Sequence, residues 1–168
     1  LNDVTSNSSG IVTLGGAITT NGNLLINSGT FTSGANLVSV VNLTNNGTTF
    51  NAPSTTLSVG GDFVNNGAFN RNNGTVDFTG ASTISGTVNP IFQNITISGL
   101  LTSPTTLNLT GNFTNNGVFN AASGTVVFTN TANGTKTIGG TATTPFNNLT
   151  IENNTANPDA SISGNATL

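Results

Sequence analysis

The chain has 168 residues, only 4% of them charged, and it contains no His, Cys, Met, Trp or Tyr. Because its two basic residues, Arg71 and Lys136, cannot neutralise a phosphate backbone, composition excludes nucleic-acid binding. No apolar run approaches the ~20 residues of a membrane-spanning helix, so membrane insertion is not expected. A chain of this length can bury one hydrophobic core, and we treat residues 1–168 as a single domain.

Internal repeats organise the chain from its first residues to its last. A partial unit, 1–11, is followed by a first full unit, 12–56, whose "VTLGGAITTNGNL" (12–24) matches "LSVGGDFVNNGAF" (57–69). The second and third units, 57–106 and 107–159, are most alike, and a partial unit, 160–168, begins a further copy. A period of about 45 to 53 residues is typical of solenoids, propellers and arrays.

Short strands alternate with turn residues inside each unit. Apolar residues alternate with Thr or Asn in "LNL", "LTI" and "ITI", whereas Gly, Asn, Ser and Pro fill the spaces between these runs. Alternation of this kind predicts β-strands, and the lack of an i, i+3, i+4 apolar stripe argues against helices. In the third unit and the start of the partial unit after it, the predicted strands centre on Leu109, Phe119, Val126, Ile138, Leu149 and Ile162.

The predicted fold is all-β: a parallel β-helix (β-solenoid) of about six or seven coils, with two coils in each ~50-residue unit. Asn-Gly turns between apolar runs are also hairpin signals, so a hairpin-built β-sandwich or a propeller fragment is the alternative. Irregular unit lengths favour the solenoid, because corners of a solenoid absorb insertions.

Phenylalanines and Asn-Asn-Gly triplets recur at equivalent places in the second and third units. We expect the phenylalanines to point inward and stack on their counterparts, which are Phe63, Phe69, Phe78, Phe113, Phe119 and Phe128. We expect the triplets to form corner turns that use positive φ and stacked amide side chains, at Asn65, Asn66, Gly67, Asn115, Asn116 and Gly117. Neutral side chains suit such a stack, because like charges in register would repel.

The inventory of reactive side chains does not predict an enzyme, a cofactor or a metal site. The acidic residues are Asp3, Asp62, Asp77, Glu152 and Asp159, and the two copies do not repeat them at equivalent positions. Serine and threonine are abundant, but no His is present to activate them. Thr-x-Thr pairs at 129–131 and 135–137 do not recur at matching positions, so an ice-binding face is not predicted. Sequons such as those at Asn42, Asn73, Asn94, Asn112 and Asn133 are common enough to be incidental in so Asn-rich a chain.

The stretch "GNFTNNGVFNAASGTVVFTNTANGTKTIGGTATTPFNNLTI" (111–151) resembles the tandem-repeat units of large bacterial cell-surface and secreted proteins. The resemblance covers the chain from about residue 12 onward and is weakest over 37–53. It implies an extracellular, adhesin-like parallel β-helix and supplies no catalytic residue.

The sequence and the resemblance together lead to a functional hypothesis. We expect a structural module that forms a stiff rod, stalk or self-assembling filament at the cell surface. Its partners would be further repeats of the same polypeptide, or other copies stacked end to end. The alternative is an adhesin module that binds glycans or a host or abiotic surface through its Asn/Thr-rich face.

Overall fold

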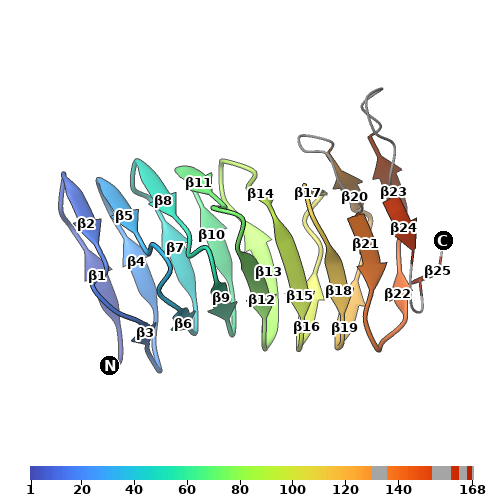
Figure 1. Cartoon of the computed structure of the whole chain (residues 1–168), viewed down its shortest axis with the longest axis horizontal. Helices are drawn as coiled ribbons and strands as arrows, with labels where there is room; N and C mark the ends of the chain where they lie inside the picture. Colours follow the sequence, from blue (N-terminus) through green and yellow to red (C-terminus); the bar gives the residue numbers. More distant parts are fainter. Residues whose placement is uncertain (130–135, 153–159, 163–165, 168) are drawn as a thin grey trace.

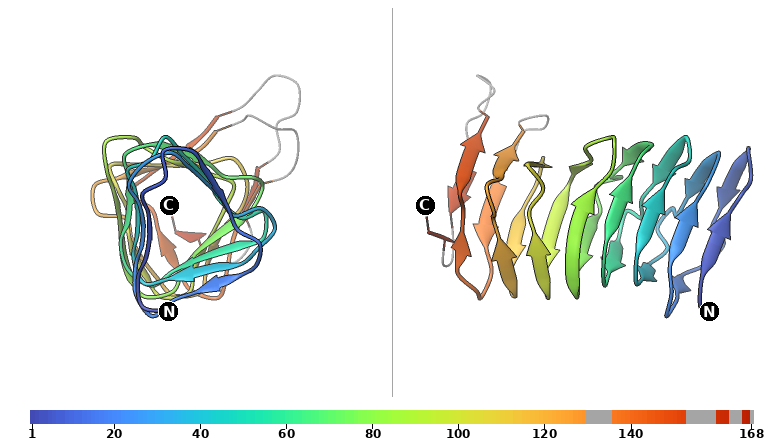
Figure 2. Two further views of the ribbon diagram at one scale, coloured as in Figure 1. Left: turned by 90° about the vertical axis from the view of Figure 1, so that its left-hand side faces the viewer. Right: turned by 180° about the vertical axis from the view of Figure 1, so that it is seen from behind.

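The computed structural model describes residues 1–129 and 136–152, together with the backbone of 160–162 and 166–167. The described residues form short β-strands and no helix, so none of them belongs to a helix that could cross a bilayer. The strands wind into a parallel β-solenoid of about seven turns. Figure 1 shows the coils side by side along the long axis, and the end-on view of Figure 2 shows them superimposed around that axis.

Three faces make up the solenoid. Face I contains β1 (Val4–Ser6), β4 (Leu24–Ile26), β7 (Leu43–Asn45), β10 (Phe63–Asn65), β13 (Ala81–Ser85), β16 (Leu100–Thr102) and β19 (Val118–Asn120). On the same face, β22 (Thr144–Pro145) lies beside β19 and pairs with β25 (Ala166–Thr167) in a separate sheet. Face II contains β2 (Ile11–Thr13), β5 (Thr30–Thr32), β8 (Thr49–Asn51) and β11 (Ala68–Asn70), then a second sheet of β14 (Ile91–Phe92), β17 (Thr106–Leu109), β20 (Thr125–Phe128) and β23 (Asn148–Ile151). Face III is one sheet of β3 (Ile18–Thr19), β6 (Val38–Val40), β9 (Thr56–Val59), β12 (Thr75–Phe78), β15 (Asn94–Ile97), β18 (Phe113–Asn115), β21 (Lys136–Gly139) and β24 (Ala160–Ile162).

One turn of the solenoid contains three strands, and most strands pair in parallel with the third strand before or after them. Phe31 of β5 pairs with Phe50 of β8, nineteen residues later, and Phe50 pairs with Phe69 of β11 after nineteen more. The regular step keeps inward-facing residues above inward-facing residues, since side chains alternate between the two faces of a strand. The predicted parallel solenoid is therefore confirmed.

Strand β13 marks a change in the otherwise regular stack. Its C-terminal residues Ile84 and Ser85 pair with β10, whereas its N-terminal residues Ala81, Ser82 and Thr83 pair with β16. The connection 86–90, which follows β13, lies where face II is divided into its two sheets, between β11 and β14. Face III is the one described face whose ladder runs without such a step or division.

A single hydrophobic core fills the tube. The buried apolar residues come from all three faces and from nearly every turn, and they form one cluster rather than separate centres. The strand pattern explains this continuity, because β4, β7 and β10 each bury their first and third residues and leave the middle one half-buried.

The prediction of two coils in each repeat is wrong. Unit 57–106 contains the eight strands β9 to β16, and unit 12–56 contains the seven strands β2 to β8. Neither number is a multiple of three, so a whole number of turns does not separate consecutive units. Equivalent residues of the second and third units therefore lie on different faces, and the expected stacking of each phenylalanine on its counterpart does not occur.

Two strands of the third unit account for the miscount. The short strand β18 lies within "NFTNN", where the asparagines indicate a corner, and β22 has only two residues, one of them Pro145. Proline and Asn-rich sequence both argue against a strand in sequence reasoning. The six strands expected from alternation correspond to β17, β19, β20, β21, β23 and β24.

Candidate functional surfaces

The six predicted core phenylalanines all lie in the common core. Phe63, Phe78, Phe113, Phe119 and Phe128 are at most 2% exposed, and Phe69 is half-buried against the same cluster. Phe63 pairs in register with Leu43 and Ile84, whereas its counterpart Phe113 pairs with Ile95 and Ile138. The sequence thus indicates the inward direction of these rings and not their stacking partners.

Four further phenylalanines complete the aromatic interior and were not singled out by the sequence comparison. Phe31 and Phe50 extend the column beneath Phe69, with ring centroids 6.1 and 5.9 Å apart along it. Phe92 contacts Phe63, Phe69 and Phe78, and Phe146 contacts Phe113 and Phe119. The nineteen-residue spacing of Phe31, Phe50 and Phe69 is the signal that could have identified this column.

The Asn-Asn-Gly triplets turn the chain, but not by the expected conformation. Asn65 and Asn115 are the last residues of β10 and β18, and the bends lie at 66–67 and 116–117. None of the six triplet residues has a positive φ, so that part of the prediction is wrong.

Close approach between coils, rather than backbone freedom, requires the glycine of each triplet. A Cβ atom on Gly67 would collide with the carbonyl oxygen of Gly47, one turn away, and a Cβ on Gly117 would collide with that of Gly99. The two glycines thus belong to different corner columns, as the strand count requires.

The expected stacking of amide side chains occurs at Asn65 and Asn66, whereas Asn115 and Asn116 bond Thr143 and Thr141 instead. Inside the tube, the buried Asn45 donates from Nδ2 to Oδ1 of Asn65 at 2.8 Å. Outside it, Asn66 donates to Asn46 at 2.8 Å and Asn27 donates to Asn7 at 2.7 Å. Such bonds satisfy amides between turns without placing charge in the stack.

The charged side chains are separated, and two of them bond the next turn as the corner asparagines do. Asp3 and Asp62 each accept a backbone N–H from the next turn, from Asn23 and Thr83 respectively. Asp77 lies on β12 of face III, away from Asp62, and Arg71 donates to Oε1 of Gln93 at 3.2 Å. Glu152 is exposed and Lys136 is buried, while Asp159 lies outside the described residues. No group of three or more His, Cys, Asp or Glu side chains that could hold a metal occurs in the described part of the chain.

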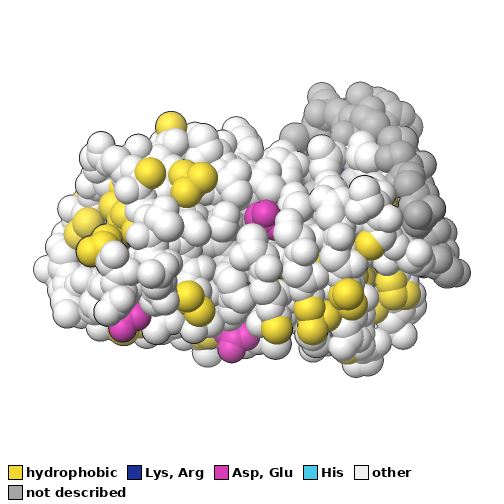
Figure 3. All heavy atoms as spheres, turned by 90° about the horizontal axis from the view of Figure 1, so that it is seen from below, with side chains coloured by type: hydrophobic (Ala, Val, Ile, Leu, Met, Phe, Trp, Pro, Cys, Tyr) yellow, Lys and Arg dark blue, Asp and Glu magenta, His cyan; other side chains and the backbone are white. Residues whose placement is uncertain are grey.

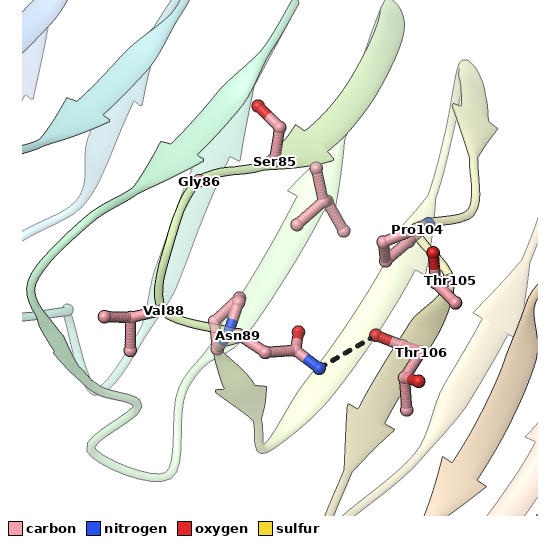
Figure 4. A pocket seen from close by; sticks show the side chains of 9 residues that line it. Ser85, Gly86, Val88, Asn89, Pro104, Thr105 and Thr106 are labelled. Atoms are coloured by element: carbon pink, nitrogen blue, oxygen red, sulfur yellow. Dashed lines mark hydrogen bonds between the residues drawn. The ribbon is translucent and has the colours of Figure 1, made fainter.

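A shallow hollow of about 410 Å³ lies beside the connection that follows β13. Figure 4 shows Val88 and Asn89 on one side of it and Pro104, Thr105 and Thr106 on the other. Asn89 donates from Nδ2 to the backbone carbonyl of Thr106 at 3.1 Å, so its amide already bridges the two sides. The hollow contains no charged side chain and no arrangement that predicts chemistry.

The outer surface of face III carries two straight columns of small polar side chains. Register places Ser39, Ser58, Asp77, Thr96 and Thr114 over one another on successive strands. A second column, of Thr56, Thr75 and Asn94, runs beside the first at two residues' distance along each strand. Most of the surface visible in Figure 3 is likewise neither apolar nor charged, and acidic side chains form a few isolated spots.

Hydroxyl groups in these columns are not used inside the protein. Among the described residues, the side chains of Ser39, Thr56, Ser58, Thr75, Thr96 and Thr114 make no hydrogen bond, although all six are only half-buried. Oδ1 of Asp77, between Ser58 and Thr96, is buried without a partner.

Most sequons examined at the sequence level coincide with the corner ladders. Asn42, Asn94 and Asn112 each accept a backbone N–H from the following turn, so a glycan on any of them would remove a ladder bond. Asn73 is exposed in a turn with φ of 60°, whereas Asn133, Thr131 and Thr135 lie outside the described residues.

Comparison with known proteins gives no match: no family model, no curated protein and no solved structure matches this chain.

Proposed function

We propose that the chain is a structural module of a bacterial extracellular protein, in which stacked coils form a stiff rod, stalk or filament. The observation that carries the proposal is the continuity of face III, where eight strands join in one parallel ladder. Hydrogen bonds in such a ladder run along the solenoid axis from coil to coil. Bending the rod therefore requires these bonds and the packed core to deform together.

Side-chain bonds between turns support the same role. The ladders Asn45–Asn65 and Asn46–Asn66 link successive coils. The rings of Phe31, Phe50 and Phe69 also contact one another from coil to coil. In repeat proteins, stability is roughly the sum of such nearest-neighbour interfaces. A module of this kind can be extended by further coils without a new core design.

The first coil offers a surface on which another coil can stack. Val4, Val12 and Ile18 point into the core but are only partly buried, whereas their register partners Leu24, Phe31 and Val38 are at most 2% exposed. A further coil, of the same polypeptide or of a second copy, would bury these apolar side chains and pair with strands β1, β2 and β3.

Electron microscopy of the purified chain at rising concentration tests the rod and its assembly. We expect short rods that lengthen end to end without change in width. A Val12→Lys variant should stay short because a charge would be buried at each junction, while Val64→Lys, at a half-buried outward position, should lengthen like the parent chain. Globular particles of uniform size, or equal lengthening of both variants, would contradict end-to-end stacking.

The location is tested separately, by treating intact source cells with protease. The extracellular proposal rests on the resemblance and on a composition without Cys or Met, which suits exposure to oxidants. We expect the chain to be degraded while cytosolic proteins survive, and protection equal to theirs would overturn the location.

A further inference from the structure

We propose that the rod has a built-in bending point at its fifth coil, which consists of β13, β14 and β15, and that face III is the spine about which it bends. The inference deepens the proposed function and rests on it, because a bending point matters only in a chain that serves as a rod. Its evidence is the pairing between coils, which changes at this place on two of the three faces.

The fourth and fifth coils are paired less completely than any other two successive coils among the described strands from β1 to β21. At every other junction in that stretch, successive coils pair on all three faces. At this junction face II has no ladder between β11 and β14, and face I pairs through only two residues of the fifth coil, Ile84 and Ser85. Hydrogen bonds between parallel strands connect one coil to the next, so this junction has fewer of the bonds that resist bending.

A shorter path explains the missing ladder. Ile84 and Asn94 of the fifth coil are ten positions apart, whereas their register partners in the fourth coil, Phe63 and Thr75, are twelve positions apart. Each residue of extended chain spans about 3.3 Å, so the fifth coil cannot follow the whole outline of the fourth. It takes a shorter route around the corner between faces I and II, where β14 is left without a ladder to β11.

The connection 86–90 also changes its hydrogen-bond partners from one coil to another. Val88 is bonded to the fourth coil, because its N–H donates to the carbonyl of Asn65 at 3.1 Å and its carbonyl accepts from Nδ2 of Asn65 at 2.9 Å. The next residue, Asn89, donates to the carbonyl of Thr106 in the sixth coil at 3.1 Å, and β14 then pairs with β17. The wall thus passes from the lower stack to the upper stack between two consecutive residues.

The corner opposite face III has room for movement. The hollow of about 410 Å³ lies there, with Val88 and Asn89 of the fifth coil on one side and Pro104 and Thr105, which precede β17 of the sixth coil, on the other (Figure 4). Connection 86–90 therefore has no β-ladder on either side. Narrowing or widening of this hollow is the movement that bends the rod.

Face III and the core remain continuous through the bending point. Strands β12 and β15 pair over four residues, and β15 continues the ladder into β18. Phe92 contacts Phe63, Phe69 and Phe78 of the fourth coil, with ring centroids 5.4 to 6.2 Å apart. Apolar packing is non-directional and tolerates small shifts, whereas hydrogen bonds depend on distance and angle. The wall can therefore yield at the corner while face III keeps its length and the core stays closed.

The test measures distances between pairs of spin labels on engineered cysteines, since the chain has no cysteine of its own. Thr49→Cys/Thr125→Cys places labels on the outside of face II in the third and seventh coils, about 19 Å apart along the axis, with the bending point between them. Thr56→Cys/Thr137→Cys is the matched pair on face III, in the same two coils. Double electron–electron resonance gives the width of each distance distribution.

A second control separates the bending point from general mobility of face II. Ile11→Cys/Ala68→Cys lies on the outside of face II within the first four coils, where that sheet is undivided. We expect the distribution for Thr49→Cys/Thr125→Cys to be about twice as wide as for either control. Circular dichroism checks that the labelled chains are folded. The bending point is overturned if the spanning pair on face II is no wider than either control.

Hydrogen exchange of the unlabelled chain keeps the test independent of the variants. We expect amides of 84–92 to exchange at least ten times faster than those of 63–71, the equivalent segment one coil earlier, because local opening needs fewer bonds to break. Equal protection of the two segments would overturn the proposal. Electron microscopy reports on the rod itself, so rods with a narrow face II distribution would remove the bending point and leave the proposed function standing.

Discussion

The segments "DFVNNGAFN" (62–70) and "NFTNNGVFN" (112–120) share most of their letters but occupy different faces of the solenoid. In the first, Phe63 and Asn65 lie on face I, over Leu43 and Asn45. In the second, Phe113 and Asn115 lie on face III, over Ile95 and Ile97. The same phrase therefore folds into the same strand, bend and strand whichever residues it meets in the preceding coil.

Contacts with the following coil are nevertheless conserved between the two segments. Asn65 donates to the carbonyl of Val88, and Asn115 donates to that of Thr143, both at 2.9 Å. The backbone N–H of Thr87 binds Oδ1 of Asn66, and that of Thr141 binds Oδ1 of Asn116. The repeat thus encodes a local structure together with the turn that closes over it, while the preceding coil needs only to be apolar at the right position.

The largest expected effect comes from removing the buried ring of each segment. Phe63→Ala and Phe113→Ala should each destabilise the solenoid by about 3 to 5 kcal/mol, because both side chains are fully buried. Denaturant unfolding monitored by circular dichroism measures both losses. A loss at one site that is several-fold smaller than at the other would show that the preceding coil, rather than the segment, determines its stability.

The next effect concerns the glycine that follows each segment in the next coil. Gly86 and Gly140 both have φ of 118°, and a Cβ on either would collide with the backbone of Asn65 or Asn115. Gly86→Ala and Gly140→Ala should each lose about 2 kcal/mol, since the strained conformation alone is worth roughly 1 to 3. Gly15→Ala is the control, because a Cβ there meets nothing within 4 Å. Equal melting temperatures for all three variants would mean that the two connections adapt freely.

A smaller effect separates the two segments instead of uniting them. Asn65 accepts a hydrogen bond from Asn45, whereas the residue below Asn115 is Ile97, which has no side-chain donor. A double-mutant cycle of Asn45→Ala and Asn65→Ala should give a coupling energy of about 1 kcal/mol. The parallel cycle of Ile97→Ala and Asn115→Ala should give no hydrogen-bond coupling, and equal coupling in both cycles would remove this distinction.

The smallest effect is expected at the position where the segments differ on the outside. Ala68 and Val118 are equivalent and both exposed. Exchanging them, with Ala68→Val and Val118→Ala, should change the free energy of unfolding by less than about 0.5 kcal/mol. A larger change in either direction, measured by the same denaturant titration, would indicate a contact that the exposed position does not reveal.

Sequence reasoning predicted the fold class because alternation and turn composition are local properties. It placed strands near Leu109, Phe119 and Val126, and it indicated the inward direction of the phenylalanines. The residues that lie over one another in successive coils were not predicted, because the face of each strand follows only from counting every strand before it. Leaving out short strands such as β18 and β22 changes the face of everything that follows.

The polar columns on face III illustrate the same difficulty at a candidate site. Thr56-x-Ser58, Thr75-x-Asp77 and Asn94-x-Thr96 differ in their letters and lie at different places within the repeat units, so comparison of whole units does not align them. They recur every nineteen residues, which is the length of one turn. The coil length, and not the longer repeat, was the period that would have brought them together.

The mismatch between units of seven or eight strands and turns of three has a consequence for how such a chain can change its length. Removing unit 57–106 would delete eight strands and shift every later strand onto a neighbouring face. All three faces bury alternate apolar residues, so the shifted strands would still find an apolar interior. Recombination between copies is thus not obliged to respect whole turns, and the gene for such a tube can gain or lose units while its product keeps a closed wall.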